Sequence, residues 1–314
     1  MKKAPDFASA LRDELLEYVK FMVDNGRAFR VETTILKEFD RFLQTQNTPE
    51  IGIDEVEQFV YGKEDLTGGQ YEKRHRIIRG FLNYRAIKGT GKSVPPPPKT
   101  KRGGRRIPYL YTQSDLARMI SLAGELAPAN SLRPHTYQTV IGLIVCTGLR
   151  VSEALNLDVS DVDLTANVLY IRATKFRKSR YVPLHPTAAS VLKKYAETKT
   201  RYFPGCENTA FFLNTRGKRV AYGTYYGPFL RLVREAGIST ESRNSTTHDL
   251  RHTFAVNRML AWYEEGLDFR DMLPVLSTYM GHAHFEDTVY YLNASAALMA
   301  KGAKSFRFGG GHNA

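Results

Sequence analysis

The segment that most limits how this chain can fold is a basic, proline-rich stretch. Residues 92–106 read KSVPPPPKTKRGGRR, with six basic residues and no acidic one. Four consecutive prolines hold the backbone extended, and the two glycines loosen the end of the segment. Such a stretch adds nothing to a hydrophobic core. It therefore predicts two domains, residues 1–91 and 107–314, joined by a linker over residues 92–106.

The domain before the linker is predicted to be all helical. Residues 10–26 and 33–46 place apolar side chains at helical spacing, and the first pattern ends at a glycine. Residues 71–89 predict a third helix with apolar side chains on one face. Its other positions carry basic residues, for which DNA contact and a merely solvated surface are both open: Lys73, Arg74, Arg76 and Arg79.

The domain after the linker is predicted to contain further helices. Ser114 is expected to cap the first of them. Residues 134–148 form a strongly apolar helix that stops at Gly148. Another helix is expected at about 186–198, and the chain from Tyr222 to about 304 is expected to be helical with loops.

A few short strands are expected between these helices. Residues 167–173 and 180–184 alternate apolar and polar side chains, which predicts a β-hairpin whose tip, TKFRKS, is basic. Residues 210–214, AFFLN, predict one more strand. The fold class is therefore mostly α with a small antiparallel β-sheet.

The net charge of +13 and the pI near 9.6 indicate a polyanionic partner, either nucleic acid or an anionic membrane surface. The longest apolar run, residues 140–146, is too short to span a bilayer. Acidic residues near the N-terminus argue against a signal peptide. Cys146 and Cys206 make neither a disulfide framework nor a four-cysteine zinc site. We expect a cytoplasmic, nucleoid-associated bacterial protein without membrane contact.

The motif HDLRH at residues 248–252 allows three interpretations. Histidines four residues apart on a helix bind zinc in the HExxH proteases, but Asp249 replaces the glutamate base and Arg251 would repel a metal. A structural interpretation has His252 packed under the helix and His248 capping it or exposed. The third interpretation is a phosphate site, because arginine grips phosphate oxygens with two parallel hydrogen bonds.

Other residues of the second domain favour the phosphate interpretation. Arg150 follows the turn at Gly148, which would present it from a rigid support. His248 and His282 can donate hydrogen bonds or move a proton near neutral pH. A hairpin lysine can act as a general acid, and a tyrosine as a nucleophile. Together these groups predict a metal-free site for a phosphodiester, whose transition state the positive charges stabilise.

Four stretches, in this order, resemble the motifs of the tyrosine recombinases, also called the phage integrase family. They are TGLRVSEAL at 147–155, ATKFRKSRYVPL at 173–184, HDLRHTFA at 248–255 and MGHAHFEDTVYY at 280–291. The resemblance covers roughly residues 105–295. It implies that residues 1–91 are a helical, SAM-like core-binding domain. It also implies that both domains close on DNA as a C-shaped clamp.

The resemblance implies six catalytic residues: Arg150, Lys175, His248, Arg251, His282 and Tyr291. Tyr291 is favoured over Tyr290 because it follows His282 by nine residues and has Thr288 three residues before it. Lys178, on the same hairpin tip, is a lesser rival to Lys175. Glu153 is expected to orient Arg150 or to cap its helix.

The remaining notable residues receive simpler interpretations. Cys146 is expected in the core, His252 buried and His284 at the surface. The stretch of 31 residues from Arg251 to His282 predicts an enlarged loop. Contacts with the DNA backbone are expected from the linker and the hairpin: Lys99, Lys101, Arg102, Arg105, Arg106, Arg177, Lys178 and Arg180.

The resemblance further implies a mechanism and an assembly. Tyr291 would form a 3′-phosphotyrosyl bond while Lys175 protonates the leaving 5′-hydroxyl, with no metal, ATP or other cofactor. Exchange of two strand pairs implies a homo-tetramer on two double-stranded DNA duplexes, with room for other recombinases of the same element. The tail at 293–304 would dock on a neighbouring subunit or pack on its own domain. The last motif points to integration or transposition of a mobile element.

Three alternatives remain at this point. A type IB topoisomerase would use the same chemistry without needing a docking tail. A relaxase with the HAH sequence at 282–284 would need a divalent metal and would leave Arg150 and Arg251 unexplained. An architectural DNA-binding partner of another recombinase would be catalytically idle on its own. The sequence does not reveal the DNA target, since specificity lies in base contacts and DNA shape.

Overall fold

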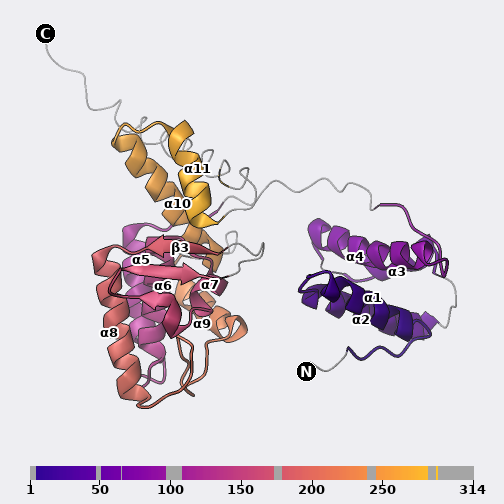
Figure 1. Cartoon of the computed structure of the whole chain (residues 1–314), viewed down its shortest axis with the longest axis horizontal. Helices are drawn as coiled ribbons and strands as arrows, with labels where there is room; N and C mark the ends of the chain where they lie inside the picture. The colour runs from indigo at the N-terminus through magenta and orange to yellow at the C-terminus, as the bar shows by residue number, and fades with distance from the viewer. Residues whose placement is uncertain are drawn as a thin grey trace, which may run out of the picture. The chain divides into compact units, whose positions relative to one another are not determined.

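The chain divides into two compact units, residues 1–106 (unit 1) and 107–314 (unit 2) (Figure 1). The computed structural model describes residues 5–46, 51–64, 66–96, 108–172, 179–238, 245–281 and 288. Within these ranges the chain is mostly helical with one small antiparallel sheet. The fold class predicted from the sequence is confirmed.

Unit 1 is built from helices that share one core. Phe39 packs edge-on against Phe59, with ring centroids 4.9 Å apart, and Phe81 is fully buried in the same cluster. Helix α3 was not predicted from the sequence, because its nine residues hold too few turns to show a period. The described helices are α1 Arg12–Asp24, α2 Arg30–Gln46, α3 Ile53–Tyr61 and α4 Gly68–Ile87.

Arg74 of helix α4 does not belong to the solvated face on which the sequence placed it. Its side chain is 7% exposed, its Nη1 donates to Glu38 Oε2 at 2.5 Å, and its guanidinium lies over the Phe59 ring. A buried, paired arginine is not available to a DNA backbone, so the expected DNA contact is wrong for Arg74. Lys73 and Arg76 are exposed, and Arg79 is half-buried with its Nε donating to the Val94 carbonyl.

Unit 2 packs its helices around the apolar helix α6. Arg133 begins this helix, Pro134 occupies its first turn, and Gly148 ends it in the left-handed conformation, as predicted. The helices of unit 2 are α5 Gln113–Gly124, α6 Arg133–Thr147, α7 Val151–Leu155, α8 Pro186–Tyr202, α9 Tyr222–Glu235, α10 Thr247–Glu264 and α11 Phe269–Met280, with a short 3-10 helix, η1, at Val159–Asp161.

The sheet of unit 2 has the order β1-β2-β3, with antiparallel pairing throughout. Strands β2 (Val168–Ile171) and β3 (Arg180–Pro183) form the predicted hairpin, with Tyr170 paired to Tyr181. The two-residue strand β1 (Val162–Asp163) was not predicted. The hairpin tip, residues 173–178, lies outside the described residues.

Two local predictions for unit 2 are wrong. The cap of α5 is Thr112 rather than Ser114: Asp115 N donates to Thr112 Oγ1 at 3.1 Å, and Thr112 N donates to Asp115 Oδ2 at 3.0 Å. Residues 210–214 are not a strand. They make only isolated bridges, although Phe212 and its neighbours are buried in the core.

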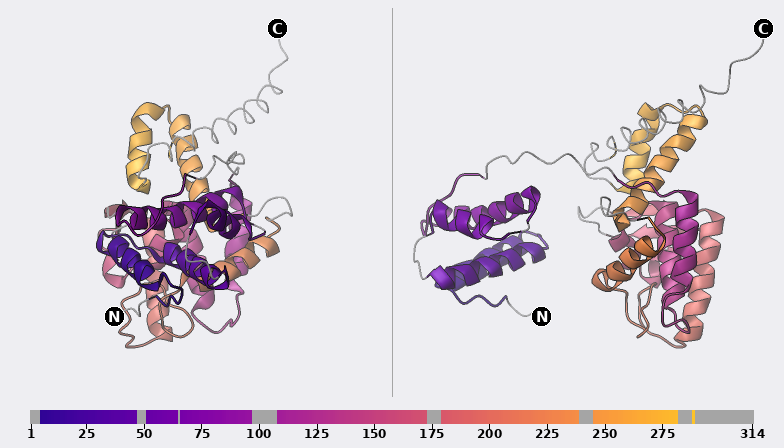
Figure 2. Two further views of the ribbon diagram at one scale, coloured as in Figure 1. Left: turned by 90° about the vertical axis from the view of Figure 1, so that its right-hand side faces the viewer. Right: turned by 180° about the vertical axis from the view of Figure 1, so that it is seen from behind.

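Helices α10 and α11 stand side by side at one end of unit 2, beyond β3 (Figures 1 and 2). Only residues 265–268 connect them. The enlarged loop expected before His282 is therefore absent between Arg251 and Gly281, because nearly all of these residues belong to α10 and α11. Trp262 and Met280 anchor the pair in a small apolar cluster.

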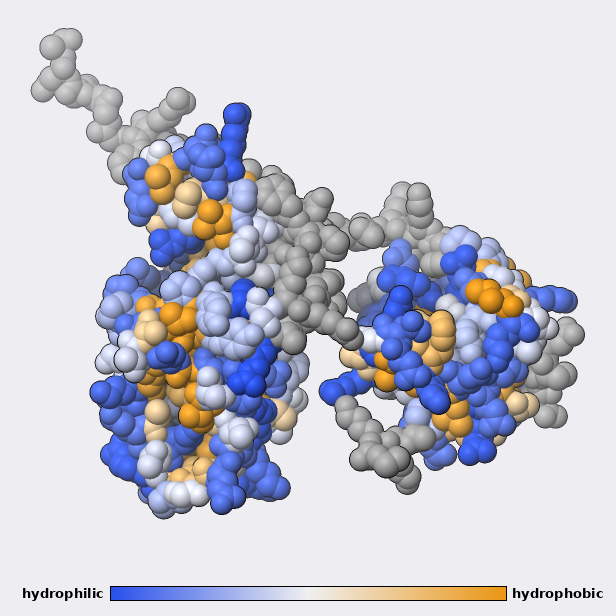
Figure 3. Space-filling model, in the orientation of Figure 1, coloured by the Kyte–Doolittle hydropathy of each residue, from blue (hydrophilic) through white to orange (hydrophobic). Residues whose placement is uncertain are grey.

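The surface of both units is largely hydrophilic on the face that Figure 3 shows, with smaller apolar patches between the polar side chains. Cys146 was expected in the core, but it is exposed at the surface, where it lines a cavity with Trp262 and Tyr279. Among the helices of the described ranges, none combines the length and apolar character needed to cross a membrane.

Candidate active site

The site begins where the buried helix α6 ends. Gly148 has φ +62°, and a Cβ at this position would lie 2.3 Å from a ring carbon of Phe254. Only glycine fits a left-handed residue pressed so closely against an aromatic ring. Leu149 then enters the core, and Arg150 starts helix α7. The turn at Gly148 thus presents Arg150 from a rigid support, as predicted.

Glu153 holds Arg150 from one turn further along α7. The carboxylate accepts from the backbone N–H of Arg150 at 3.0 Å and from its Nη1 at 2.8 Å. Glu153 was expected either to orient Arg150 or to cap its helix, and these two hydrogen bonds show that it does both. The side chain of Arg150 stays 28% exposed and lines a surface cavity of about 360 Å³. Its guanidinium is therefore fixed on one side and open on the other.

Glu153 also binds a second arginine, Arg180 of strand β3. Arg180 Nη2 donates to Glu153 Oε2 at 2.7 Å, and its Nη1 donates to Oε1 at 3.2 Å. Burial raises the pKa of the Glu153 carboxyl, but the hydrogen bonds and charges of Arg180 and Arg150 outweigh burial and hold that pKa below its usual value. Arg180 is only 11% exposed and turned inward, so its expected role as a DNA-backbone contact is wrong.

Arg251 lies on helix α10, whose first turn is stabilised by a capping box of Thr246 and Asp249. Thr246 N donates to Asp249 Oδ2 at 2.7 Å, so the carboxylate that replaces the HExxH base serves as a helix cap. Arg251 itself is 1% exposed. Its Nη1 donates to the Gly148 carbonyl at 2.6 Å, which ties α10 to the turn that presents Arg150.

Three arginines from three separate elements meet at the end of helix α11. Helix C-termini leave carbonyls without partners inside the helix and carry partial negative charge. Here three consecutive carbonyls each accept from a different arginine: Tyr279 O from Arg180 at 2.8 Å, Met280 O from Arg251 at 2.7 Å, and Gly281 O from Arg150 at 3.0 Å.

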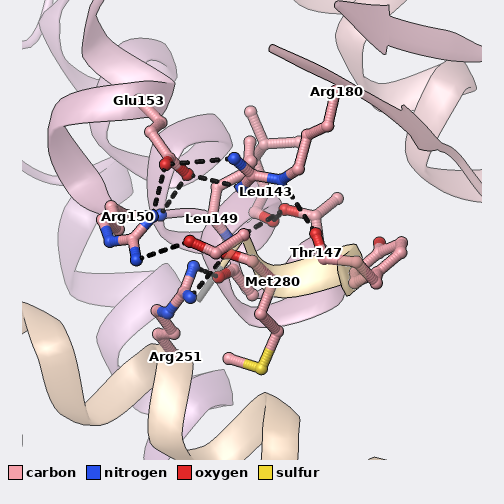
Figure 4. Close-up of polar contacts among 11 residues, drawn as sticks. Leu143, Thr147, Leu149, Arg150, Glu153, Arg180, Arg251 and Met280 are labelled. Carbon is pink, nitrogen blue, oxygen red and sulfur yellow. Dashed lines mark hydrogen bonds and ion pairs between the residues drawn. The ribbon is translucent and has the colours of Figure 1, made fainter. Parts of the chain in front are cut away.

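We call Arg150, Arg180 and Arg251, together with Glu153, the arginine cluster. Figure 4 shows Glu153 between Arg150 and Arg180, with Arg251 reaching the same region from below. The cluster carries three positive charges and one negative charge in a mostly buried place. It fixes the backbone just before His282, the next residue in the sequence.

His248 and His252 lie beside each other on α10. Their ring centroids are 4.6 Å apart and the rings meet edge to face. His248 is exposed, which is one of the two positions expected for it, whereas His252 is half-buried rather than buried. Within the described residues, no group of three or more His, Cys, Asp or Glu side chains is arranged to hold a metal ion.

Several predicted residues lie outside the described part of the chain. Thr288, three residues before the favoured nucleophile, is described and fully buried. The undescribed ones are the hairpin residues Lys175, Arg177 and Lys178, the linker residues Lys99, Lys101, Arg102, Arg105 and Arg106, and the residues of the last motif, His282, His284, Tyr290 and Tyr291. The structure thus brings together Arg150, Glu153 and Arg251 and leaves the other assignments as predictions.

Sequence reasoning missed the place of Arg180 in the cluster. The signal was present in the strand itself, because side chains alternate between faces along a strand. Val182 is fully buried, so Arg180, two residues earlier, shares its inward face. An arginine on the core face of a strand calls for a buried carboxylate, and Glu153 is that carboxylate.

Comparisons with known proteins bear on this site. The sequence profile of the phage integrase family matches residues 112–297. A putative integrase/recombinase, y4rE, of Sinorhizobium fredii is 33% identical over 97% of this chain and 98% of its own length. The tyrosine recombinase XerD of Oceanobacillus iheyensis is 25% identical over 93% of this chain and 88% of its own length.

Among solved structures, the XerH site-specific recombinase bound to palindromic difH substrate has a similar fold. Its TM-score is 0.65 at 18% identity, covering 96% of this chain and 92% of that one. Fold, family profile and relatives together define the class, which is that of the site-specific recombinases. The chain belongs to the phage integrase family, the tyrosine recombinases.

Proposed function

We propose that this recombinase cuts and rejoins double-stranded DNA through a covalent bond between Tyr291 and a 3′-phosphate, as part of the movement of a mobile element. The observation that supports this best is the arginine cluster. It holds Arg150 rigidly, leaves one side of its guanidinium open, and concentrates positive charge at the point from which the chain continues to His282.

The proposed reaction needs no outside energy source. Tyr291 gives its hydroxyl proton to a histidine of the site, His248 or His282, and its oxygen attacks the phosphorus. A Tyr–O–P bond forms, and the bond from phosphorus to the 5′-oxygen breaks. Lys175 gives that oxygen its proton, and a 5′-hydroxyl of another strand later reverses the step. Arg150 contacts the phosphate oxygens, and Arg251, buried behind it, adds charge that favours the pentacoordinate transition state.

Unit 1 and the linker are proposed as the part that encircles the recombination site. Lys73 and Arg76 are exposed on α4 and fit a role in contacting DNA phosphates. Two duplexes with two strand pairs to exchange require four active sites, so we propose a homo-tetramer, with other recombinases of the same element as further partners.

A covalent trap tests the chemistry. The chain is incubated with a nicked duplex that carries the ends of the element encoding it, with chelator present. We expect a protein–DNA adduct that survives denaturant. Tyr291→Phe should abolish it, a loss of more than about 10³-fold, because no other group supplies the nucleophile.

Tyr290→Phe is the matched control and should leave the adduct in place. Loss in Tyr290→Phe alone would move the nucleophile by one residue. A chelator-sensitive adduct would contradict the metal-free mechanism. DNA binding without any adduct in the unmodified chain would favour an architectural partner that is idle on its own.

A further inference from the structure

Arg180 lies next to the proposed active site, although its described hydrogen bonds reach none of the proposed catalytic residues. Its side chain is 11% exposed, and all three of its nitrogens donate inward, to Glu153 and to the Tyr279 carbonyl. A surface arginine on a hairpin would extend into solvent. This one is held by a two-pronged pair with a carboxylate, the strongest geometry available to arginine.

The charges around Glu153 show what this pair does. Glu153 is 7% exposed and ionised, and both its oxygens are shared between Arg150 and Arg180. With Arg180 present, the three residues carry a net charge of +1. Without it, the carboxylate would cancel Arg150. Coulomb interactions are strong at sites shielded from water, so the positive potential offered to a phosphate would fall sharply.

The end of helix α11 couples the same two arginines through the backbone. Gly281 has φ +66°, and a Cβ at this position would lie 2.7 Å from Arg180 Nη1. The guanidinium of Arg180 therefore packs directly against the backbone of Gly281, whose carbonyl accepts from Arg150 at 3.0 Å. Moving Arg180 would disturb the carboxylate and the carbonyl that together fix Arg150.

We propose that Arg180 is a positioning residue that acts through Glu153. It balances the negative charge of this carboxylate and holds the carboxylate in place. Arg150 then faces the scissile phosphate with its positive charge not cancelled by Glu153. This inference rests on the proposed function. It adds a residue of the hairpin strand to the groups on which strand cleavage depends.

The test compares DNA affinity with the single-turnover rate of adduct formation on the nicked duplex. For Arg180→Gln we expect affinity within about threefold of the unmodified chain and cleavage slower by on the order of 10²-fold. Arg180→Lys keeps the charge and loses the two-pronged geometry, so it should recover about tenfold of that loss. Adding Glu153→Gln to Arg180→Gln should also recover part of the rate, since the unbalanced carboxylate is gone.

Arg219 provides a matched control. It also bridges a carboxylate, Asp158, and backbone carbonyls, those of Leu155 and Leu157, but none of its described hydrogen bonds reaches Glu153 or Arg150. Arg219→Gln should lower thermal stability and leave the cleavage rate of the folded protein unchanged. A loss of cleavage as large as that of Arg180→Gln would overturn the specific role of Arg180.

The remaining outcomes are also decisive. If the unmodified chain forms no adduct, the proposed function fails and this inference falls with it. If the unmodified chain forms the adduct and Arg180→Gln cleaves within about threefold of it, only the positioning role fails. Should Arg180→Gln not fold, Arg180→Lys decides: cleavage about tenfold slower at unchanged affinity supports the role, and equality with the unmodified chain overturns it.

Discussion

Gly148 lies between the buried helix α6 and the active-site residue Arg150, and its backbone angle φ sets the direction in which the chain leaves α6. Its φ of +62° is costly for any residue with a Cβ, and the Phe254 ring leaves no room for one. Gly148→Ala combines strain with overpacking, which together should cost about 3 kcal/mol. In a unit of this size we expect a fall in Tm of about 6–12 °C in thermal unfolding.

Gly142, in the middle of the same helix, is the control for that substitution. A Cβ there meets nothing within 4 Å, and alanine is the better helix former. Gly142→Ala should therefore raise the stability of unit 2 by up to about 1 kcal/mol. Equal effects of the two substitutions would show that the angle at Gly148 is not what limits the fold.

The buried and exposed faces of helix α4 are expected to have different roles, the first in stability and the second in DNA binding. Arg74 is buried, pairs with Glu38 and lies over Phe59, whereas Arg76 is exposed. Arg74→Ala leaves Glu38 without this partner, but Glu38 is 35% exposed and can rehydrate, so we expect a loss of about 2 kcal/mol in the unfolding free energy of unit 1.

Arg76→Ala should do the opposite. Its effect on denaturant unfolding should stay within about 0.5 kcal/mol, and it should weaken DNA binding measurably at low salt. Both quantities are measured on the full chain, by urea titration and by a fluorescence binding assay. A stable Arg74→Ala variant with weakened DNA binding would restore the surface assignment that the structure has replaced.

Elements with a strong pattern could be predicted from the sequence, and elements held by distant contacts could not. Helix α6 shows its end through Gly148, and the hairpin shows its alternation over residues 167–184. Residues 210–214 have the composition of a strand, but Phe212 and its neighbours are buried by packing and pair with no neighbouring strand. Local propensity alone cannot predict whether such a segment pairs in a sheet or is buried without a strand partner, because tertiary packing decides this.

The candidate site divides in the same way. Arg150 and Arg251 were found because each sits in a motif with a defined spacing. The role of Arg180 depends on a carboxylate 27 residues earlier in the chain and on a carbonyl 99 residues later. The sequence contains all three groups, but only the fold shows that α7 and β3 begin at the point where α11 ends.

At the scale of the whole molecule, the net charge of +13 is unevenly distributed: residues 1–91 have no net charge, residues 92–106 carry +6 and residues 107–314 carry +7. The linker residues Lys99, Lys101, Arg102, Arg105 and Arg106 are proposed to contact DNA phosphates. Each phosphate neutralised by a cation releases counterions and adds about 0.9 to the steepness of log K against log salt concentration. Replacing all five residues by glutamine should therefore reduce that slope by up to about 4.5.

The salt titration distinguishes a DNA-tracking linker from a spacer whose charge only aids solubility. A spacer would leave the slope unchanged, because its cations would release no counterions on binding. Lys193→Gln with Lys194→Gln, on the exposed face of α8, is the control for a general loss of positive charge and should change the slope by less than about 0.5. If this control lowers the slope as much per charge as the linker substitutions do, the linker has no special contact with DNA, and the overall charge of the molecule accounts for the affinity.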